Sequence, residues 1–208
     1  MRHTRSRTPV VIALLAMLFA GLGSLVAPGA SAAPTQAGHR VSGLSGTTAV
    51  TTAPGIAGTF VRAGVIPLPV HPASVRIGFD HGFSLTYGFP VTGGNPDLDR
   101  GKGHLLHSGG IDFVGVGGSR LEIGKFDIDL AAGKIFAREV NFESNRIPVL
   151  DLDLSKLRVS VRHGATVLSN IGLYLDPVAA SALNTTFDLG LPEDGTLLFG
   201  KGRVTLRG

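Results

Sequence analysis

The chain has 208 residues and no cysteine, and its 19 Lys and Arg against 15 Asp and Glu give a formal net charge of +4 at pH 7. The absence of cysteine excludes disulfides, thiolate metal sites and cysteine nucleophiles. Both methionines, Met1 and Met17, lie within the first 32 residues, so the rest of the chain also lacks the residues for His/Met haem ligation.

The first 32 residues have the three parts of an export signal. Arg2, Arg5 and Arg7 form a basic start, residues 10–22 are uncharged and apolar, and residues 30–32 (ASA) have the small-x-small form of a cleavage site. The apolar run is shorter than the roughly 20 residues of a membrane-spanning helix, and no second such run follows. We therefore expect a secreted or envelope-associated protein with no transmembrane segment in the mature chain.

Removal of the signal would change the charge of the protein. Three of the 19 cations lie in the signal, so 16 cations remain against 15 acids, a net charge of +1. No basic run longer than two residues remains in the mature chain. The sequence therefore predicts no nucleic-acid partner, because it has no electrostatic footprint for one.

The mature chain is expected to have two parts. Residues 33–50 are rich in Ala, Gly, Ser and Thr, which predicts a flexible linker. Residues 51–208 are long enough for a single β-rich domain with its own core. In chain order, residues 52–63 are expected to hold a short helix, and from residue 74 onward the apolar residues recur at every second position, as in half-buried strands.

The alternation is clearest in residues 120–130. Apolar residues occupy positions 121 and 123, and then positions 126, 128 and 130, so their parity shifts by one. A β-bulge at Gly124-Lys125 would keep both halves facing the core. The same alternation predicts strands at 150–154, 157–161 and 167–175, with Asp151 and Asp153 turned to solvent.

These patterns together predict the fold class. Many short strands separated by glycine-rich turns, without strand–helix alternation, indicate an all-β fold, mainly an antiparallel sandwich or barrel, with one or two short helices. One helix has a clear beginning, because Asp176 is a suitable N-cap and Pro177 suits the first helical position. This helix is expected to end at Phe187 and to be followed by closing strands at 197–199 and 203–206.

Two pairs of alternating acids are candidates for hydrolytic chemistry. Asp127/Asp129 and Asp151/Asp153 have the i, i+2 spacing that would place two carboxylates at a glycosidase distance on a strand. Their position on the polar side of alternating strands favours an ordinary solvated face. Neither G-x-S-x-G nor H-E-x-x-H occurs, so we assign no catalytic residue and expect the chain not to be an enzyme.

Candidate metal ligands are also few. Residues 95–101 (NPDLDRG) carry oxygen ligands at alternate positions, like part of a calcium loop, but include Arg100 and lack the later acid of an EF-hand. An Asp/Asn turn is the favoured interpretation. His104 and His107 are three residues apart, and on a strand they would point to opposite faces. No metal site is therefore predicted.

Motifs from residue 89 onward are similar to those of a known family. The motifs are FPVTGG at 89–94, G-x-G-x-x-x-H-S-G-G-x-x-F at 101–113, DLDLS at 151–155 and N-x-x-F at the end of the predicted helix. Over about residues 85–206 the chain resembles the HtaA-like (haem-transport-associated) domains of secreted actinobacterial proteins. The resemblance implies a β-rich sandwich or barrel with one or two short helices.

The resemblance also implies a function for the best-known members of the family. They bind haem at the cell surface and pass it to an importer, using a Tyr ligand in an aromatic N-terminal segment assisted by a His. Residues 51–75 of this chain contain neither Tyr nor Trp. The chain is therefore similar to a subgroup that lacks the haem-ligand segment, and no haem ligand is transferred from the family.

Three functions remain open from the sequence. The first is a secreted, non-enzymatic β-rich protein that binds a small-molecule ligand or a cell-envelope partner. The second is a haem-binding protein of a haem-uptake system with a displaced ligand, for which Tyr87, Tyr174 and His107 are the candidates, since a phenolate can hold ferric haem. The third is an envelope hydrolase that uses the Asp pairs. No cofactor is assured, and haem is the one that the second function would require.

Overall fold

The computed structural model describes residues 44–80, 82–139 and 142–207. The predicted signal and most of the predicted linker lie outside these residues. The elements in chain order are β1 (Ser45–Thr52), α1 (Ile56–Arg62), β2 (Val65–Val70), β3 (Ser74–Gly78), β4 (Ser84–Gly94), β5 (His104–His107), β6 (Gly110–Gly115), β7 (Arg120–Asp129), β8 (Lys134–Glu139), β9 (Phe142–Asp153), β10 (Arg158–Arg162), β11 (Ala165–Leu175), α2 (Pro177–Phe187) and β12 (Leu198–Arg207).

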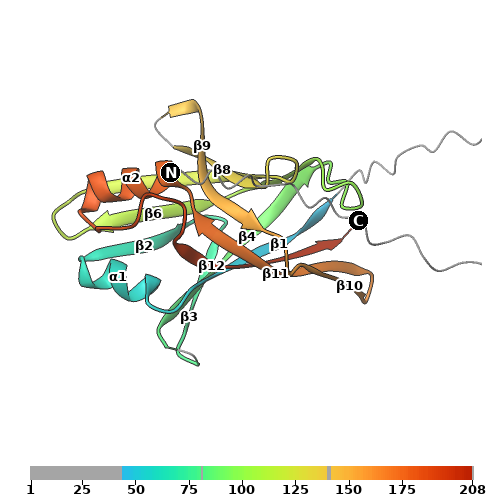
Figure 1. Cartoon of the computed structure of the whole chain (residues 1–208), viewed down its shortest axis with the longest axis horizontal. Helices are drawn as coiled ribbons and strands as arrows, with labels where there is room; N and C mark the ends of the chain where they lie inside the picture. The colour runs from blue at the N-terminus through green and yellow to red at the C-terminus, as the bar shows by residue number, and fades with distance from the viewer. Residues whose placement is uncertain (1–43, 81, 140–141, 208) are drawn as a thin grey trace, which may run out of the picture. The chain divides into compact units, whose positions relative to one another are not determined.

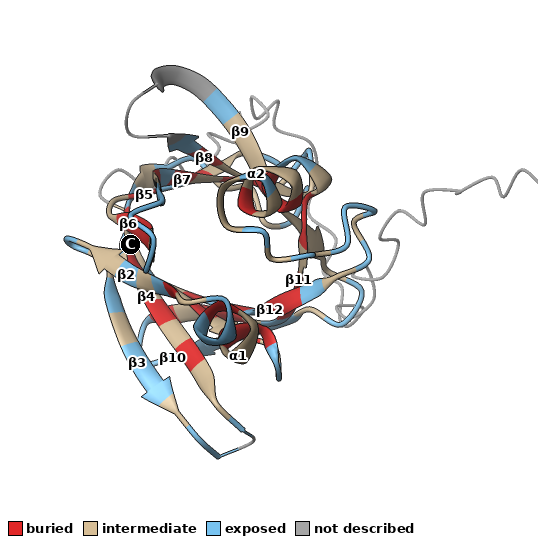
Figure 2. Cartoon of the chain, turned by 90° about the vertical axis from the view of Figure 1, so that its left-hand side faces the viewer, coloured by how far each residue is buried: buried red, intermediate tan, exposed pale blue. Residues whose placement is uncertain are grey.

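Eight antiparallel strands close into a barrel, seen from the side in Figure 1 and as a ring in Figure 2. Their order is β7, β5, β4, β1, β12, β11, β9 and β8, and the ring closes because β8 pairs again with β7. The prediction of an all-β, mainly antiparallel fold with one or two short helices is confirmed. The protein has two helices, and of the two predicted architectures it has the barrel. Closure pairs the backbone N–H and C=O groups of β8 with those of β7, whereas an open sandwich would leave such groups unpaired at its edges.

The other four strands extend the wall of the barrel. β6 pairs with the first half of β7 and β2 pairs with β6. β3 pairs with the first half of β4, and β10 pairs with the first half of β11. β3 and β10 therefore leave the barrel as parts of hairpins, which are visible in Figure 1.

The β-bulge predicted in β7 is present. The register between β7 and β8 shifts between Gly124 and Asp127, and Lys125 has a φ of 51°. The amide of Lys125 donates to the carbonyl of Gly109 at 3.0 Å, away from the regular ladder. Because of the bulge, Phe126 and Ile128 on the second half of the strand are buried in the core.

Helix α2 also begins as predicted. The amide of Val178 donates to Oδ1 of Asp176 at 2.9 Å, and Pro177 is the first helical residue. The helix ends at Phe187, as predicted, and the C-cap residue Asp188 has a φ of 54°. It packs against β9 and β7, and Figure 2 shows both helices at the same end of the barrel. Among the described residues, no helix combines the length and the apolar character needed to cross a bilayer.

Two predictions at the N-terminal end need correction. Residues 45–50, which fall in the predicted linker, belong to β1, where Thr48 and Val50 are buried between β4 and β12. β2, with the sequence VIPLPV, precedes the region in which strands were expected. Its two prolines break the strand pattern, and they are tolerated because β2 pairs only with β6 and lies at an edge.

Two predictions in the C-terminal half also need correction. The alternation in residues 157–161 predicts a half-buried strand, yet every residue of β10 is exposed. β10 pairs only with β11 and diverges from the wall, so Val159 and Val161 have no core to pack against. The two predicted closing strands are one continuous strand, β12, because Gly200 and Gly202 lie inside the sheet and do not form a turn.

Candidate functional site

The barrel contains a cavity of about 120 Å³. Nineteen described residues line it, and all of them except Thr48 and His107 are apolar. Helix α2 covers part of the cavity with Ala179, Ala182 and Leu183. The rest of the lining comes from inward-facing residues of the strands, because alternate residues on each strand point into a closed barrel.

Thr48 and His107 form the polar part of this lining. Nδ1 of His107 lies 3.2 Å from the carbonyl oxygen of Phe126, and Nε2 lies 2.7 Å from Oγ1 of Thr48. A carbonyl can only accept, so Nδ1 carries the proton of the neutral imidazole. Nε2 is then an acceptor, and the Thr48 hydroxyl donates to it. Both side chains are buried, and both are hydrogen-bonded.

His107 also occupies a special position in the barrel wall. The regular pairing of β5 with β7 ends at Leu106, opposite Asp127. At the next residue, the ring of His107 donates to the Phe126 carbonyl. The imidazole therefore links β5 to β7 where their regular pairing ends, next to the bulge at Lys125.

A groove of about 270 Å³ lies on the outer side of the wall at this point. It shares His107 and Phe126 with the inner cavity, so the imidazole and this aromatic ring separate the two spaces. The groove also contains Phe136, whose ring lies 3.5 Å from the guanidinium carbon of Arg146. Its remaining charged residues are Lys125, Asp127 and Arg138.

The buried position of His107 predicts a pH-dependent stability. Burial lowers the pKa of its imidazole below the usual 6.5, against the smaller raising effects of its hydrogen bonds and Asp127. Protons therefore bind more readily to the unfolded chain, and the free energy of unfolding falls as the pH drops below about 6.5 towards the folded-state pKa. We expect urea denaturation to give a lower free energy of unfolding at about pH 5.5 than at about pH 7.5. In the His107→Phe variant, this difference between the two pH values should be smaller.

A matched control is available in His163, which is exposed in the turn between β10 and β11. The His163→Asn variant is expected to keep the pH dependence of the wild type. Asparagine suits the left-handed backbone at this position, where φ is 49°. An equal loss of pH dependence in both variants would contradict the assignment to His107.

The two candidate tyrosines lie away from the cavity. Tyr87 is 2% exposed on β4. Its hydroxyl donates to the carbonyl of Pro67 at 2.7 Å, and burial raises the pKa of its phenol well above the usual value. Tyr174 is half-buried and alternates with the buried Leu173 and Leu175, so it lies on the outer side of β11. The structure therefore does not place Tyr87, Tyr174 and His107 around one common space.

The first acid pair contacts Arg146 and His104. Nη2 of Arg146 lies 3.0 Å from Asp127 and 3.1 Å from Asp129. Nδ1 of His104 donates to Asp127 at 2.9 Å. The hydrogen bond from the amide of Ala132 is the largest cause that lowers the pKa of Asp129. A general acid needs a raised pKa, whereas the pKa of Asp129 is lowered, and both acids take part in a network of hydrogen bonds and ion pairs.

The second acid pair is also engaged in structural contacts. Asp151 forms an ion pair with Lys134, which also contacts Asp176. Asp153 accepts from the amide of Ser155 at 2.9 Å. Hydrogen bonds from Ser155 lower the pKa of the Asp153 carboxyl. The pKa values of Asp129 and Asp153 are therefore lowered, the opposite of the shift that an acid catalyst requires.

The candidate metal ligands form other interactions. Asp97 accepts from the amide of Arg100, three residues on, at 3.0 Å and pairs with its guanidinium at 2.8 Å, so its carboxylate closes a local turn. His104 and His107 point to opposite faces of β5, with His107 buried and His104 beside Asp127. Within the part of the chain that the structure describes, no group of three or more His, Cys, Asp or Glu residues could hold a metal ion.

Sequence reasoning missed two parts of the site. Thr48 lies in the predicted linker, although the β-branched residues of TTAVTT (47–52) have strand propensity and were a usable signal. The outer groove brings Phe136 and Arg146 together from β8 and β9. No local pattern marks this groove, because it depends on the pairing of strands.

Two solved structures are similar to this chain. The C-terminal domain of HtaA from Corynebacterium glutamicum has a TM-score of 0.46 and 20% identity, covering 78% of this chain and 99% of that domain. A domain-swapped dimer variant of the same domain has a TM-score of 0.44 and 18% identity, covering 73% of this chain and 90% of the other. No family model matches the chain, and no curated protein matches it.

Proposed function

We propose that the chain is a non-enzymatic binding protein whose barrel cavity holds a small apolar molecule. The observation that supports this proposal is an almost wholly apolar cavity that contains one hydrogen-bonded polar pair. Ligand sites commonly have this composition, with apolar walls and a few placed polar groups that orient the ligand. The proposal includes export from the cytoplasm, which rests on the predicted signal in residues 1–32.

The size of the cavity limits the ligand. An apolar cavity of about 150 Å³ stays dry and binds benzene or xenon. The cavity here, at about 120 Å³, suits a molecule of similar or smaller size. A porphyrin ring is far larger than this space.

The polar pair limits the chemistry of the ligand. The Thr48 hydroxyl donates its proton to Nε2 of His107, so its remaining capacity is that of an acceptor. A ligand that carries one O–H or N–H donor could therefore bind to Oγ1 of Thr48. We infer that the preferred ligand is a small apolar molecule with one such donor, and phenol is a suitable probe.

The test compares phenol with benzene, using calorimetric titration of the predicted mature chain, residues 33–208. We expect saturable binding of phenol that is tighter than binding of benzene. Thr48→Val should remove this preference, because it removes the acceptor that faces the ligand. Ala179→Leu should abolish binding of both probes, since Ala179 is buried and lines the cavity.

The control for the filled cavity is Ala131→Leu, at an exposed position in the turn between β7 and β8. It adds the same atoms outside the barrel and should leave binding unchanged. Circular dichroism must show that both leucine variants are folded. The proposal fails if the wild type binds neither probe, or if Ala179→Leu binds them as the wild type does.

Haem is a second candidate ligand, and the outer groove is the observation that favours it. The groove combines His107 and two phenylalanine rings with Lys125, Arg138 and Arg146, which would suit the propionates. Both ring nitrogens of His107 already form hydrogen bonds, so iron ligation would have to replace one of them. The described geometry therefore suits haem less well than it suits a small ligand in the cavity.

Titration with hemin separates the two candidates. A saturable shift of the Soret band at one equivalent, lost in His107→Ala, would support haem in the outer groove. Loss of the shift in Tyr87→Phe or Tyr174→Phe would support a displaced tyrosine ligand. If no shift occurs in a folded protein, haem is excluded as the ligand of this chain.

A further inference from the structure

Two arginines of β12 point away from the core of the barrel. Arg203 and Arg207 are exposed, whereas the residues at positions 204 and 206 are buried. Successive side chains of a strand alternate between its two sides. Thr205 therefore lies between the two arginines on the outer side of the sheet.

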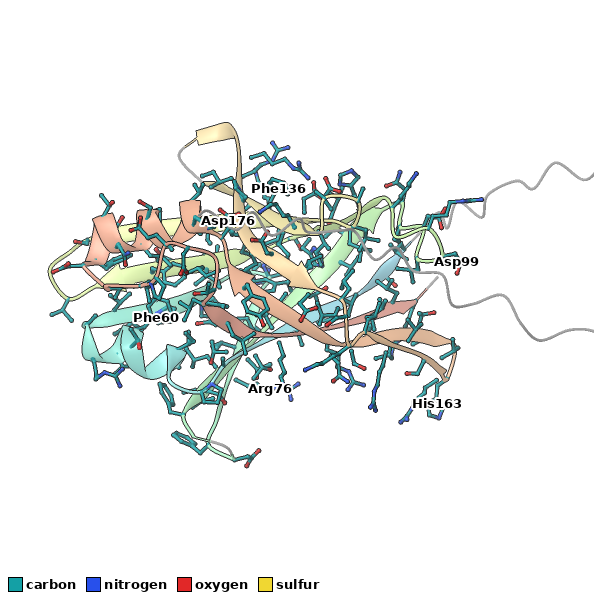
Figure 3. All side chains as sticks on the ribbon, in the orientation of Figure 1. Phe60, Arg76, Asp99, Phe136, His163 and Asp176 are labelled. Carbon is teal, nitrogen blue, oxygen red and sulfur yellow. The ribbon has the colours of Figure 1, made fainter. Side chains whose placement is uncertain are left out.

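β10 adds two more arginines on the same side. Ser160 is opposite Val167 of β11, and Val167 is opposite Thr205. Residues directly opposite each other in antiparallel strands point to the same side, and Arg158 and Arg162 are each two residues from Ser160. We name the four residues the arginine cluster: Arg158, Arg162, Arg203 and Arg207. Figure 3 shows nitrogen-tipped side chains along the part of the barrel that ends at His163, in the β10–β11 turn.

Val167 lies at the centre of the arginine cluster. Each of the four arginines is its diagonal neighbour, at a distance of about 7–8 Å that long side chains can span. Val167 is only 6% exposed, although it points outward and is not part of the hydrophobic core. Its direct neighbours, Ser160 and Thr205, have short side chains. Arginine stems cover apolar surface in this way, which holds the four guanidinium groups around one patch.

The arginine cluster has no acid beside it in the described part of the chain. None of its members forms an ion pair there, whereas Arg100, Arg120 and Arg146 each contact an acid. β10, β11 and β12 contain no Asp or Glu. The acid that follows in the register is Asp153 of β9, opposite Gly172 and beyond the irregularity in β11. Four uncompensated positive charges on one patch attract an anion.

The spacing of the arginine cluster suits an anion that carries several charges. The two arginines of one strand are four residues apart, about 13 Å, and β10 and β12 are about 10 Å apart. A chain of phosphate groups can reach across both strands, whereas a single small anion would contact only part of the cluster. The planar guanidinium fork binds phosphate bidentately. The hydroxyls of Ser160 and Thr205 can donate to further phosphate oxygens.

Two other anionic partners fit this side less well. The interface of a bilayer accepts apolar side chains together with cations. The exposed Val159 and Val161 of β10 are opposite Leu168 and Thr166, so they point to the other side of the sheet. Single-stranded nucleic acids stack their bases on aromatic side chains, and residues 158–169 and 203–207 contain no Phe, Tyr or Trp.

We propose that the arginine cluster binds a free chain of phosphate groups. The arginines of β10 and of β12 contact different phosphates of the same chain, and the two hydroxyls between them donate to its oxygens. This site is on the outside of the barrel, and it is independent of the cavity and of the ligand proposed for it.

The test is calorimetric titration of the predicted mature chain, residues 33–208, with inorganic tripolyphosphate. We expect saturable binding that weakens with salt, and weaker binding of inorganic phosphate and of citrate. The double variant Arg162→Gln and Arg207→Gln removes one cation from each strand and should bind on the order of tenfold more weakly. The control is Arg62→Gln with Lys102→Gln, two exposed positions outside these strands. It removes the same charge and should stay within about twofold of the wild type.

A second pair of variants tests the side of the sheet. Ser160→Glu places an acid within the arginine cluster, and Val161→Glu places the same charge on the other side of the same strand. Both positions are exposed, and circular dichroism checks that the variants are folded. Only Ser160→Glu should abolish binding. Equal losses in the two variants, no binding by the folded wild type, equally tight binding of citrate, or tighter binding of anionic vesicles or oligothymidylate at equal phosphate concentration would each overturn the proposal.

Discussion

Asp176→Ala is expected to destabilise the barrel by about 3 kcal/mol, because this one carboxylate caps α2 and forms a buried ion pair. Its Oδ1 accepts from the amide of Val178 at 2.9 Å, and its Oδ2 accepts from Nζ of Lys134 at 2.7 Å. The Asp176 side chain is only 5% exposed. Alanine would therefore remove the cap and leave Lys134 without its buried partner.

Urea denaturation measures the free energy of unfolding and so checks this expectation. The m-value, the slope of this free energy against urea concentration, should stay unchanged. The control is Asp151→Ala, which removes the other partner of Lys134 at a side chain that is 37% exposed. This variant keeps the cap and the contact with Asp176, so we expect a loss of about 1 kcal/mol or less. Equal losses in the two variants would show that neither burial nor capping distinguishes Asp176.

Gly200→Ala is expected to weaken the closure of the barrel between β1 and β12. A Cβ at this position would lie 2.2 Å from the carbonyl oxygen of Thr51 and 3.2 Å from Cα of Thr52. Both are backbone atoms, so β1 would have to move away from β12. Overpacking of this kind costs about 3 kcal/mol.

Thermal denaturation measures this loss, and hydrogen exchange should show that the amides of β1 lose protection first. Gly93→Ala is the matched control, since Gly93 is also a strand glycine but has no atom within 4 Å of an added Cβ. We expect its stability to stay within about 0.5 kcal/mol of the wild type. A Gly200→Ala variant as stable as this control would contradict the close approach of the two strands.

Local patterns in the sequence were sufficient to predict several elements. The bulge at Lys125 follows from a shift in parity between positions 123 and 126, because strands alternate with a period of two. The beginning of α2 follows from Asp176 and Pro177, whose effects act within one helical turn. These predictions held because the interactions behind them join residues that are close in the sequence.

Other elements were missed because their stability comes from distant partners. Residues 45–50 have the composition of a linker, yet they form β1 between β4 and β12, which are far away in the sequence. The alternation of β10 is that of a buried strand, but no layer covers its inner side. In both cases tertiary packing overrides the local pattern.

The sequence by itself determined that this protein is an antiparallel β domain without thiol chemistry, with one well-capped helix and a bulged strand. Only the tertiary structure decided that the strands close into a barrel, and that Thr48 and His107, 59 residues apart, meet at its cavity. It also decided that Arg158 and Arg162 share one side of the sheet with Arg203 and Arg207. The physical reason is that strand register, which joins residues far apart in the chain, determines which side chains share a side of the sheet.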